Sequence, residues 1–122
     1  MDKPENCTSF ENLQIWQKAH KFVLHIYEMT KTFPESEKFG LRSQLRRAAV
    51  SIPANIAEGY GKRSSADKAR FYNIAQGSLN ECLYYLRLTK DLGYSETDSL
   101  KNQLNEIAKM LNRYIGKVLA SS

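Results

Sequence analysis

The chain contains few of the residues that build cross-linked or metal-centred domains. Only two of its 122 residues are cysteines, Cys7 and Cys82, which is too few for a disulfide scaffold or a structural zinc site. We therefore expect two free thiols. Glycine (6 residues) and proline (3 residues) are also sparse, and 42% hydrophobic with 25% charged residues is ordinary for a globular protein rather than a disordered one.

Long apolar runs are missing as well. No uninterrupted apolar stretch approaches the roughly 20 residues that a membrane-spanning helix needs, and residues 1–10 are acidic and polar, unlike a signal peptide. We expect a cytoplasmic protein without a membrane segment. A length of 122 residues suits one domain, so we predict a single domain over 1–122 with a polar N-terminal head at 1–10.

Apolar residues recur at helical spacing in four segments, which predicts an all-α protein. The first segment covers 13–30, the second follows Ser36 and has its apolar positions from 41 to 56, the third runs from the serines at 64–65 to about 92, and the fourth follows Ser95 to 118. Short turns between long helices favour an antiparallel up-down-up-down four-helix bundle. The inward positions predicted for the last three helices are Leu41, Leu45, Ala48, Ala49, Ile52 and Ile56, then Phe71, Ala75, Ser78, Cys82, Tyr85, Thr89 and Leu92 with Leu79, Leu83 and Leu86, then Leu100, Leu104, Ile107, Leu111, Tyr114 and Val118.

The first helix carries two neighbouring apolar stripes. One consists of Leu13, Trp16, His20, Val23, Tyr27 and Thr30, and the other of Ile15, Ala19, Phe22, Ile26 and Met29. One bundle core needs only one stripe. The second stripe either widens the packing against two neighbouring helices or forms an oligomer interface through Ile15, Phe22, Ile26 and Met29.

Pro53 lies inside the second apolar pattern. Proline removes a backbone donor and clashes with the preceding turn, so helix two is predicted to be kinked near Pro53. The alternative is that the helix ends at Ile52 and a new one begins with Pro53 in its first turn.

The turns carry recognisable start and stop signals. Pro34 ends the first helix, Ser36 is the predicted start of the second, and Phe39 is expected to pack near that turn. Gly93 is the predicted stop of the third helix. Capping-box spacing places helix starts at Ser64 with Asp67 and at Ser95 with Asp98.

Lysine and arginine (18) outnumber aspartate and glutamate (13), which gives a formal charge of +5 and favours anionic partners. The basic residues gather in two groups, flanked in the second by Tyr60 and Tyr72, and we predict that they bind nucleic acid through phosphates. The alternative is a solvated surface whose arginines pair with Glu37, Glu58 or Asp67. Repetition around an oligomer would strengthen weak sites. The predicted nucleic-acid-binding residues are Arg42, Arg46, Arg47, Lys62, Arg63, Lys68 and Arg70.

Motifs for catalysis, metals and cofactors are missing. The sequence contains no GxxxxGK[ST] or GxSxG pattern and no glutamate followed three residues later by histidine. His20 and His25 are five residues apart and do not share a helix face as a metal pair would. We therefore predict a protein that is not an enzyme, with no cofactor and no metal.

Several polar residues flank the predicted core, and they are expected to form a structural network across the bundle. An alternative assigns Glu58 and Glu81 to acid–base catalysis as a pair of carboxylates. The predicted network consists of Gln44, Ser51, Asn55, Glu58, Ser78 and Glu81, with Gln76 nearby.

Several segments resemble those of a known family. They are Phe10-Glu11-Asn12-Leu13 with Trp16-Gln17, Phe39-Gly40-Leu41, Ser43-Gln44-Leu45-Arg46-Arg47-Ala48, Ser51-Ile52-Pro53-Ala54-Asn55-Ile56-Ala57-Glu58-Gly59, and Phe71 followed by Gly77-Ser78 and Glu81. The chain resembles the bacterial 23S rRNA intervening-sequence proteins, also called the S23 ribosomal protein family, over nearly its whole length.

The resemblance implies a four-helix bundle that assembles into a ring-shaped homopentamer, without catalytic residues to carry over. A related branch, the accessory variability protein of diversity-generating retroelements, implies binding to nucleic acid and to a reverse transcriptase. The leading hypothesis is therefore a homo-oligomer that binds nucleic acid, RNA in particular. The second is a scaffold that binds a protein such as a reverse transcriptase through exposed apolar residues of the first helix.

Overall fold

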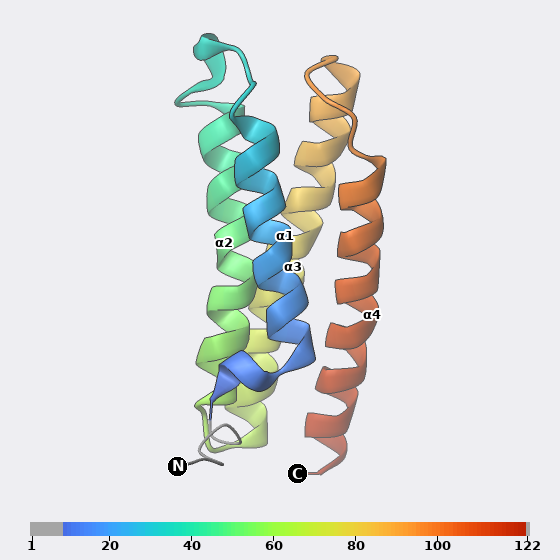
Figure 1. Cartoon of the computed structure of the whole chain (residues 1–122). Helices are drawn as coiled ribbons and strands as arrows, with labels where there is room; N and C mark the ends of the chain where they lie inside the picture. The colour runs from blue at the N-terminus through green and yellow to red at the C-terminus, as the bar shows by residue number, and fades with distance from the viewer. Residues whose placement is uncertain (1–8, 122) are drawn as a thin grey trace, which may run out of the picture.

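The computed structural model describes residues 9–121, which fold into four long α-helices and two short 3-10 turns without a β-strand in that range. The elements are η2 (Phe10–Asn12), α1 (Gln14–Thr30), η3 (Glu35–Glu37), α2 (Leu41–Tyr60), α3 (Ser65–Asp91) and α4 (Asp98–Ala120). In Figure 1 the chain turns at the top between α1 and α2, at the bottom between α2 and α3, and at the top again between α3 and α4. The predicted head at 1–10 lies largely outside the described residues, and so does Cys7.

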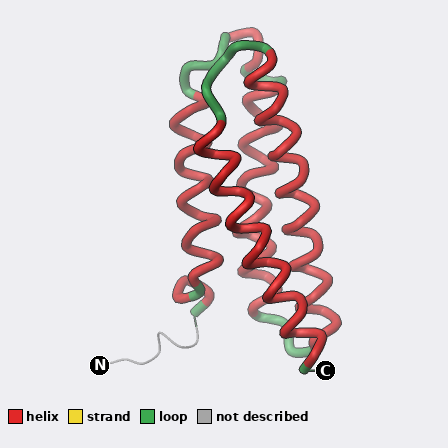
Figure 2. The backbone as a smooth tube through the Cα atoms, turned by 90° about the vertical axis from the view of Figure 1, so that its right-hand side faces the viewer, coloured by secondary structure: helices red, strands yellow, loops and turns green. Residues whose placement is uncertain are grey.

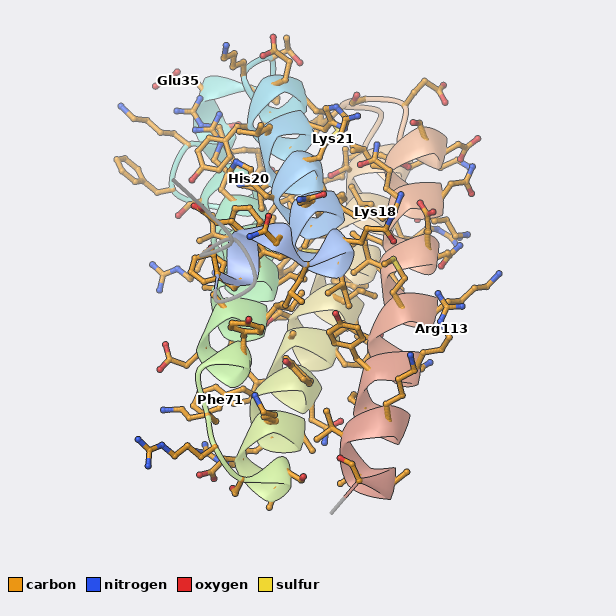
Figure 3. All side chains as sticks on the ribbon, turned by 60° about the horizontal axis from the view of Figure 1, so that its bottom comes forward. Lys18, His20, Lys21, Glu35, Phe71 and Arg113 are labelled. Carbon is orange, nitrogen blue, oxygen red and sulfur yellow. The ribbon has the colours of Figure 1, made fainter. Side chains whose placement is uncertain are left out.

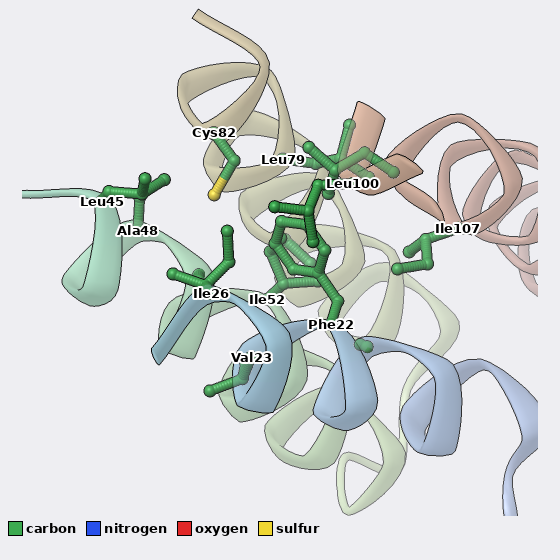
Figure 4. Close-up of a cluster of buried hydrophobic side chains, with 14 of the residues drawn as sticks. Phe22, Val23, Ile26, Leu45, Ala48, Ile52, Leu79, Cys82, Leu100 and Ile107 are labelled. Atoms are coloured by element: carbon green, nitrogen blue, oxygen red, sulfur yellow. The ribbon is translucent and has the colours of Figure 1, made fainter. Parts of the chain in front are cut away.

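The helices stand side by side as a bundle, and Figure 2 shows that loops occupy only its two ends. One hydrophobic cluster includes buried side chains from all four helices. Figure 4 shows its centre, where Phe22 and Ile26 of α1 meet Ile52 of α2 and Leu79 and Cys82 of α3. None of the helices within 9–121 combines the length with the apolar composition that a membrane-spanning helix requires.

Helix α1 faces the core mainly with the second of its two predicted stripes, to which Val23 and Thr30 of the first stripe add buried side chains. Ile15, Phe22 and Ile26 have no exposed surface, because they fill the space between the other helices. The predicted oligomer interface through these three residues is therefore wrong, since side chains sealed inside one chain cannot contact another. Met29, the fourth predicted interface residue, is half-buried against the same core.

Helix α2 continues through Pro53, which lies inside it and is buried. The alternative in which the helix ends at Ile52 is therefore wrong, while a bend at Pro53 stays a prediction. Gly59, in the last turn, is also buried, because the ring of Tyr72 on α3 lies against its backbone.

Helix α3 begins at the predicted cap, since the Asp67 backbone N–H donates to Ser64 Oγ at 3.1 Å. Its end is also as predicted. Gly93 has a φ of 75°, its N–H donates to Lys90 O at 3.0 Å, and the Tyr94 N–H donates to Thr89 O at 3.0 Å. This pair of bonds is a Schellman motif, which needs a left-handed residue at the position of Gly93.

Two predicted helix starts are wrong. Helix α2 begins after Gly40 rather than at Ser36, and the side chain that caps it is Glu37, whose Oε1 accepts from the Leu41 N–H at 2.9 Å. Helix α4 begins at Asp98 after Thr97, while the Ser95 hydroxyl donates to Glu96 O at 3.2 Å instead of capping a helix.

Candidate nucleic-acid interface

The first group of predicted basic residues lies at the start of α2, beside the turn that follows α1 (Figure 1). Its arginines share a surface hollow of about 370 Å³ with aromatic and polar neighbours. The hollow contains four cationic side chains and no carboxylate. Its lining residues, called the α2 hollow below, are Tyr27, Lys38, Phe39, Arg42, Ser43, Arg46 and Arg47.

Arg46 is held in one position within the α2 hollow. Its Nε donates to Thr30 Oγ1 at 2.7 Å and its Nη2 donates to Tyr27 O at 3.2 Å. The guanidinium carbon lies 4.4 Å from the centroid of the Tyr27 ring. Arg46 therefore ties α2 to the last turn of α1, where a cation also interacts favourably with the helix dipole.

Arg42 and Arg47 have no acidic partner: neither forms an ion pair with any side chain in residues 9–121. Glu37, one of the predicted acidic partners, is engaged elsewhere: Oε1 accepts from Leu41 N–H, and Oε2 accepts from the Tyr94 hydroxyl at 2.8 Å. These two hydrogen bonds, the backbone bond first, lower the pKa of Glu37 below its ordinary value. The arginines of the α2 hollow thus keep their charge available.

Phe39 does not pack into the turn as predicted, since 87% of its surface is exposed. The position inside the turn is taken by Phe33, which is 5% exposed and lies 5.3 Å from the Tyr94 ring between centroids. Because Phe33 fills that space, Phe39 projects from the rim of the α2 hollow. The nearest cation to its ring is Lys38, with Nζ at 5.5 Å from the centroid.

The second basic group, around the turn from α2 to α3, is mostly occupied by contacts within the chain. Lys62 Nζ lies 3.5 Å from Glu58 Oε2 and Arg70 Nη2 lies 3.8 Å from Asp67 Oδ1. Lys68 Nζ donates to the backbone oxygen of Tyr60 at 2.8 Å and of Gly59 at 3.4 Å. Arg63 is exposed and forms no ion pair with the described residues. The pairs with Glu58 and Asp67 agree with the alternative interpretation of the sequence, in which the basic residues are neutralised by acidic residues of the same chain.

Of the two aromatic residues predicted to flank the second group, Tyr72 differs from the prediction. Tyr72 is only 2% exposed, and burial raises its pKa to about 12, so it belongs to the core rather than to a binding surface. Tyr60 does contact the group, with Lys68 Nζ 5.6 Å from its ring centroid, and Phe71, labelled in Figure 3, contacts two further basic residues. Lys62 Nζ lies 5.1 Å and Arg70 Cζ 4.5 Å from its centroid.

The predicted polar network forms around two serines. Ser51 Oγ on α2 and Ser78 Oγ on α3 are 2.7 Å apart, and Asn55 Nδ2 donates to Ser51 Oγ at 3.0 Å and to Ser51 O at 2.8 Å. Gln44 is linked separately, through the Tyr85 hydroxyl at 3.4 Å.

Two predicted members, Glu58 and Glu81, are exposed and stand outside this cluster. Glu58 pairs with Lys62, and Glu81 faces Tyr85, whose pKa is raised by burial first and by Glu81 second. Gln76, also singled out from the sequence, donates to Asn80 Oδ1 at 3.4 Å. The network is therefore smaller than predicted.

The structure also separates the two carboxylates that were weighed as an acid–base pair. Ser51 of α2 and Ser78 of α3 lie at the same height in the bundle, because their hydroxyls are in contact. Glu58 follows Ser51 by seven residues, toward the turn that connects α2 to α3. Glu81 follows Ser78 by three residues, in the direction away from that turn. Ten residues of helix correspond to about 15 Å along the axis. Paired catalytic carboxyl groups stand within about 10 Å of one another, so Glu58 and Glu81 do not act on one bond.

The two histidines lie apart. His20 stacks on Trp16 with ring centroids 5.0 Å apart, and His25 Nδ1 lies 3.2 Å from Gln103 Oε1 on α4. Within 9–121, no three histidine, cysteine, aspartate or glutamate side chains are arranged to hold a metal ion. The remaining cysteine, Cys82, is buried, and burial raises the pKa of its thiol to about 12.

Comparison with known proteins identifies the family. Residues 11–113 match the model of the 23S rRNA-intervening sequence protein family. The chain belongs to this family. A solved structure with the same fold is the protein of unknown function from the S23 ribosomal protein family of Bacteroides thetaiotaomicron, which is 31% identical with a TM-score of 0.77 and covers 83% of this chain and 97% of its own. No curated protein matches the chain.

Within this intervening-sequence protein, sequence reasoning found the arginines of the α2 hollow but missed Phe39 and Tyr27 as parts of it. The spacing of Arg42 and Arg46 along one helix was a sufficient signal for the arginines. Tyr27 was assigned to an apolar stripe, and Phe39 was expected to pack near the turn. Only the packing of Phe33 reveals that Phe39 is left outside.

Proposed function

We propose that this intervening-sequence protein is a homo-oligomer that binds nucleic acid, RNA in particular, and that it acts by binding rather than by catalysis. The observation that carries the proposal is the α2 hollow, in which Arg42 and Arg47 have no acidic partner among residues 9–121. A guanidinium group matches the geometry of a phosphate with two parallel N–H donors. The two free arginines therefore suit backbone phosphates.

The distribution of acids supports this assignment. All six ion pairs found among residues 9–121 involve basic residues outside the α2 hollow, so the paired carboxylates neutralise charge elsewhere on the surface. An excess of five positive charges over the whole chain adds a favourable long-range field for a polyanion. The ion pairs are Lys18–Glu106, Lys31–Glu28, Lys62–Glu58, Arg70–Asp67, Arg87–Asp91 and Lys90–Asp98.

Arg46 contributes to the proposed site in a different way. Its hydrogen bonds to Thr30 and Tyr27 fix the wall of the hollow before a ligand arrives. A preorganised site loses less conformational entropy on binding. Arg46 is therefore a positioning residue, while Arg42 and Arg47 are the proposed phosphate ligands.

The choice of RNA is supported by the family, whose description refers to 23S rRNA. The homo-oligomer, a pentamer by family resemblance, is supported by exposed apolar side chains on the outer surfaces of α2 and α3. Val50 is 41% exposed, Ile74 is 42% exposed and Tyr84 is 61% exposed. Several copies of one α2 hollow would hold a single RNA more firmly than one copy, because the later contacts form at high effective concentration.

The test is to compare wild-type protein with Arg42→Ala/Arg47→Ala in RNA binding at low salt. The matched control is Lys109→Ala/Arg113→Ala, which removes two charges from exposed residues of α4, a helix that contributes no residue to the hollow; Figure 3 labels Arg113. We expect the first variant to lose at least tenfold in affinity and the control to change by less than about threefold. Equal losses in both variants would show that only net charge matters and would contradict the proposed site.

The oligomer is tested by light scattering of the wild-type protein. We expect the mass of several chains. If the protein is a monomer at the concentrations used for binding, the proposal that several copies hold one RNA is wrong. The phosphate contacts of a single chain are then still tested by the Arg42→Ala/Arg47→Ala variant.

A further inference from the structure

Phe39 is the most exposed large apolar side chain among residues 9–121, with 87% of its surface accessible. It stands between η3 and the start of α2, on the rim of the α2 hollow beside Arg42, Ser43 and Arg47. An aromatic ring in water gains nothing for folding, and although Lys38 Nζ lies over the Phe39 ring at 5.5 Å from its centroid, most of the surface of Phe39 is accessible to a flat partner. The combination of such a ring with unpaired guanidinium groups points to a ligand that has both a flat face and a phosphate.

Other exposed aromatic surfaces of the chain lack this combination. Tyr84 is 61% exposed and lines a hollow between α3 and α4, but the one arginine there, Arg87, is paired with Asp91, and the lining contains two aspartates beside Lys90 and Lys101. Tyr27, within the α2 hollow, has one side of its ring covered by Arg46. Phe39 is thus the ring in residues 9–121 that is both widely exposed and next to free arginines.

The form of the nucleic acid follows from what an exposed ring can reach. In a duplex each base lies between its stacked neighbours, so a side chain on the protein surface meets only base edges and phosphates. Unpaired bases present their faces, which stack on aromatic side chains and on arginine guanidinium planes. Phosphates alone would be served by the arginines and would leave Phe39 without a role.

We propose that the α2 hollow binds unpaired nucleotides of RNA, with a base stacked on Phe39 and the adjoining phosphates on Arg42 and Arg47. This rests on the proposed function and narrows it from nucleic acid in general to single-stranded segments, loops or bulges. Lys38, whose Nζ lies 5.5 Å from the Phe39 ring centroid, adds a cation beside the stacked base. Stacking recognises every base, so the site discriminates the unpaired from the paired state rather than one sequence from another.

The experiment uses the full chain and three probes of equal length, about 10 nucleotides, within the site sizes of single-strand-binding proteins. The probes are an unpaired RNA, the same RNA annealed to its complement, and an abasic strand that keeps the phosphates but offers no bases. Wild-type protein is compared with Phe39→Leu, which keeps an apolar side chain and removes the flat ring. Tyr84→Leu is the control for loss of an exposed aromatic elsewhere.

We expect wild-type protein and Tyr84→Leu to bind the unpaired RNA more tightly than the duplex or the abasic strand. Phe39→Leu should lose roughly 5- to 150-fold in affinity for the unpaired RNA, the range for one stacked base, and little for the other two probes. Because Phe39 is exposed, this variant should keep its thermal unfolding midpoint.

The remaining outcomes overturn the inference in distinguishable ways. If wild-type protein binds all three probes equally, or if Phe39→Leu keeps the preference for unpaired RNA, Phe39 does not stack on bases, while the phosphate contacts stand. If Phe39→Leu lowers the mass of the protein in solution, Phe39 belongs to a contact between chains. If wild-type protein binds none of the probes, both this inference and the proposed function fail.

Discussion

Gly59 packs its backbone directly against the ring of Tyr72: a Cβ at Gly59 would lie 2.7 Å from Tyr72 Cε1 and 3.2 Å from Phe71 Cβ. This contact lets α2 and α3 approach closely near their connecting turn. Gly77, on the exposed side of α3, has no such neighbour within 4 Å of a Cβ built there. The two glycines therefore make a matched pair.

We predict that Gly59→Ala lowers the free energy of unfolding by about 1–3 kcal/mol, because the added methyl group overpacks a buried contact. Gly77→Ala should raise it by about 0.5–1 kcal/mol, since alanine is the better helix former and the space is open. Urea unfolding of both variants measures the difference. A stabilising Gly59→Ala would mean that Tyr72 moves aside at little cost.

Arg46→Ala is predicted to lower the free energy of unfolding by about 1–3 kcal/mol, because a charged, half-buried donor to Thr30 and Tyr27 is lost. Arg47→Ala, which removes an exposed arginine one residue away, should change it by less than about 0.5 kcal/mol. Thermal unfolding of both variants measures the two changes in stability. Equal effects would show that Arg46 does not fix the α2 hollow.

The lowered pKa of Glu37 predicts a pH dependence of stability. The Leu41 N–H and the Tyr94 hydroxyl favour the carboxylate in the folded chain. Its contribution is therefore present above the ordinary pKa of 4.5 and is lost as the pH falls through the lower folded value. Glu37→Gln keeps an acceptor but not the charge, so the stability gap between wild-type protein and this variant should narrow below about pH 4.5. A gap that stays constant down to pH 2 would contradict the assigned hydrogen bonds.

Cys82 is predicted to be unreactive in the folded protein. Burial, with a smaller effect of Glu81, raises its pKa from 9.0 to about 12, so the thiolate is scarce and inaccessible near neutral pH. In Cys7→Ser, which leaves Cys82 as the single thiol of the chain, alkylation by iodoacetamide should proceed only in denaturant. Rapid alkylation under native conditions would show that the core opens at α3.

The bundle could be predicted from the sequence because its apolar pattern and its short turns are local features, although Leu92, predicted to face inward, is 48% exposed. Leu100, Leu104, Ile107 and Leu111 recur at helical spacing and are buried as predicted. The stop at Gly93 and the cap at Ser64 were predictable for a similar reason, since each depends on residues a few positions apart.

What could not be predicted depends on tertiary packing. Both stripes of α1 contain large hydrophobic residues, so the packing of the other helices determines that Phe22 faces inward while Tyr27 remains on the surface. The burial of Thr30 also depends on tertiary packing. This side chain is fully buried, and its hydroxyl is satisfied there because it donates to Ile26 O at 2.7 Å and accepts from Arg46. The exposure of Phe39 likewise follows from Phe33 taking the space inside the turn.

The most direct test of the central claim is the salt dependence of binding to an unpaired RNA, measured for wild-type protein and for Arg42→Ala/Arg47→Ala. Each phosphate contact to a single strand contributes a slope of about 0.7 to the fall of log K with log salt concentration. Loss of both arginines from one α2 hollow should therefore reduce the slope by about 1.4. An unchanged slope would show that neither arginine contacts phosphate and would contradict the account.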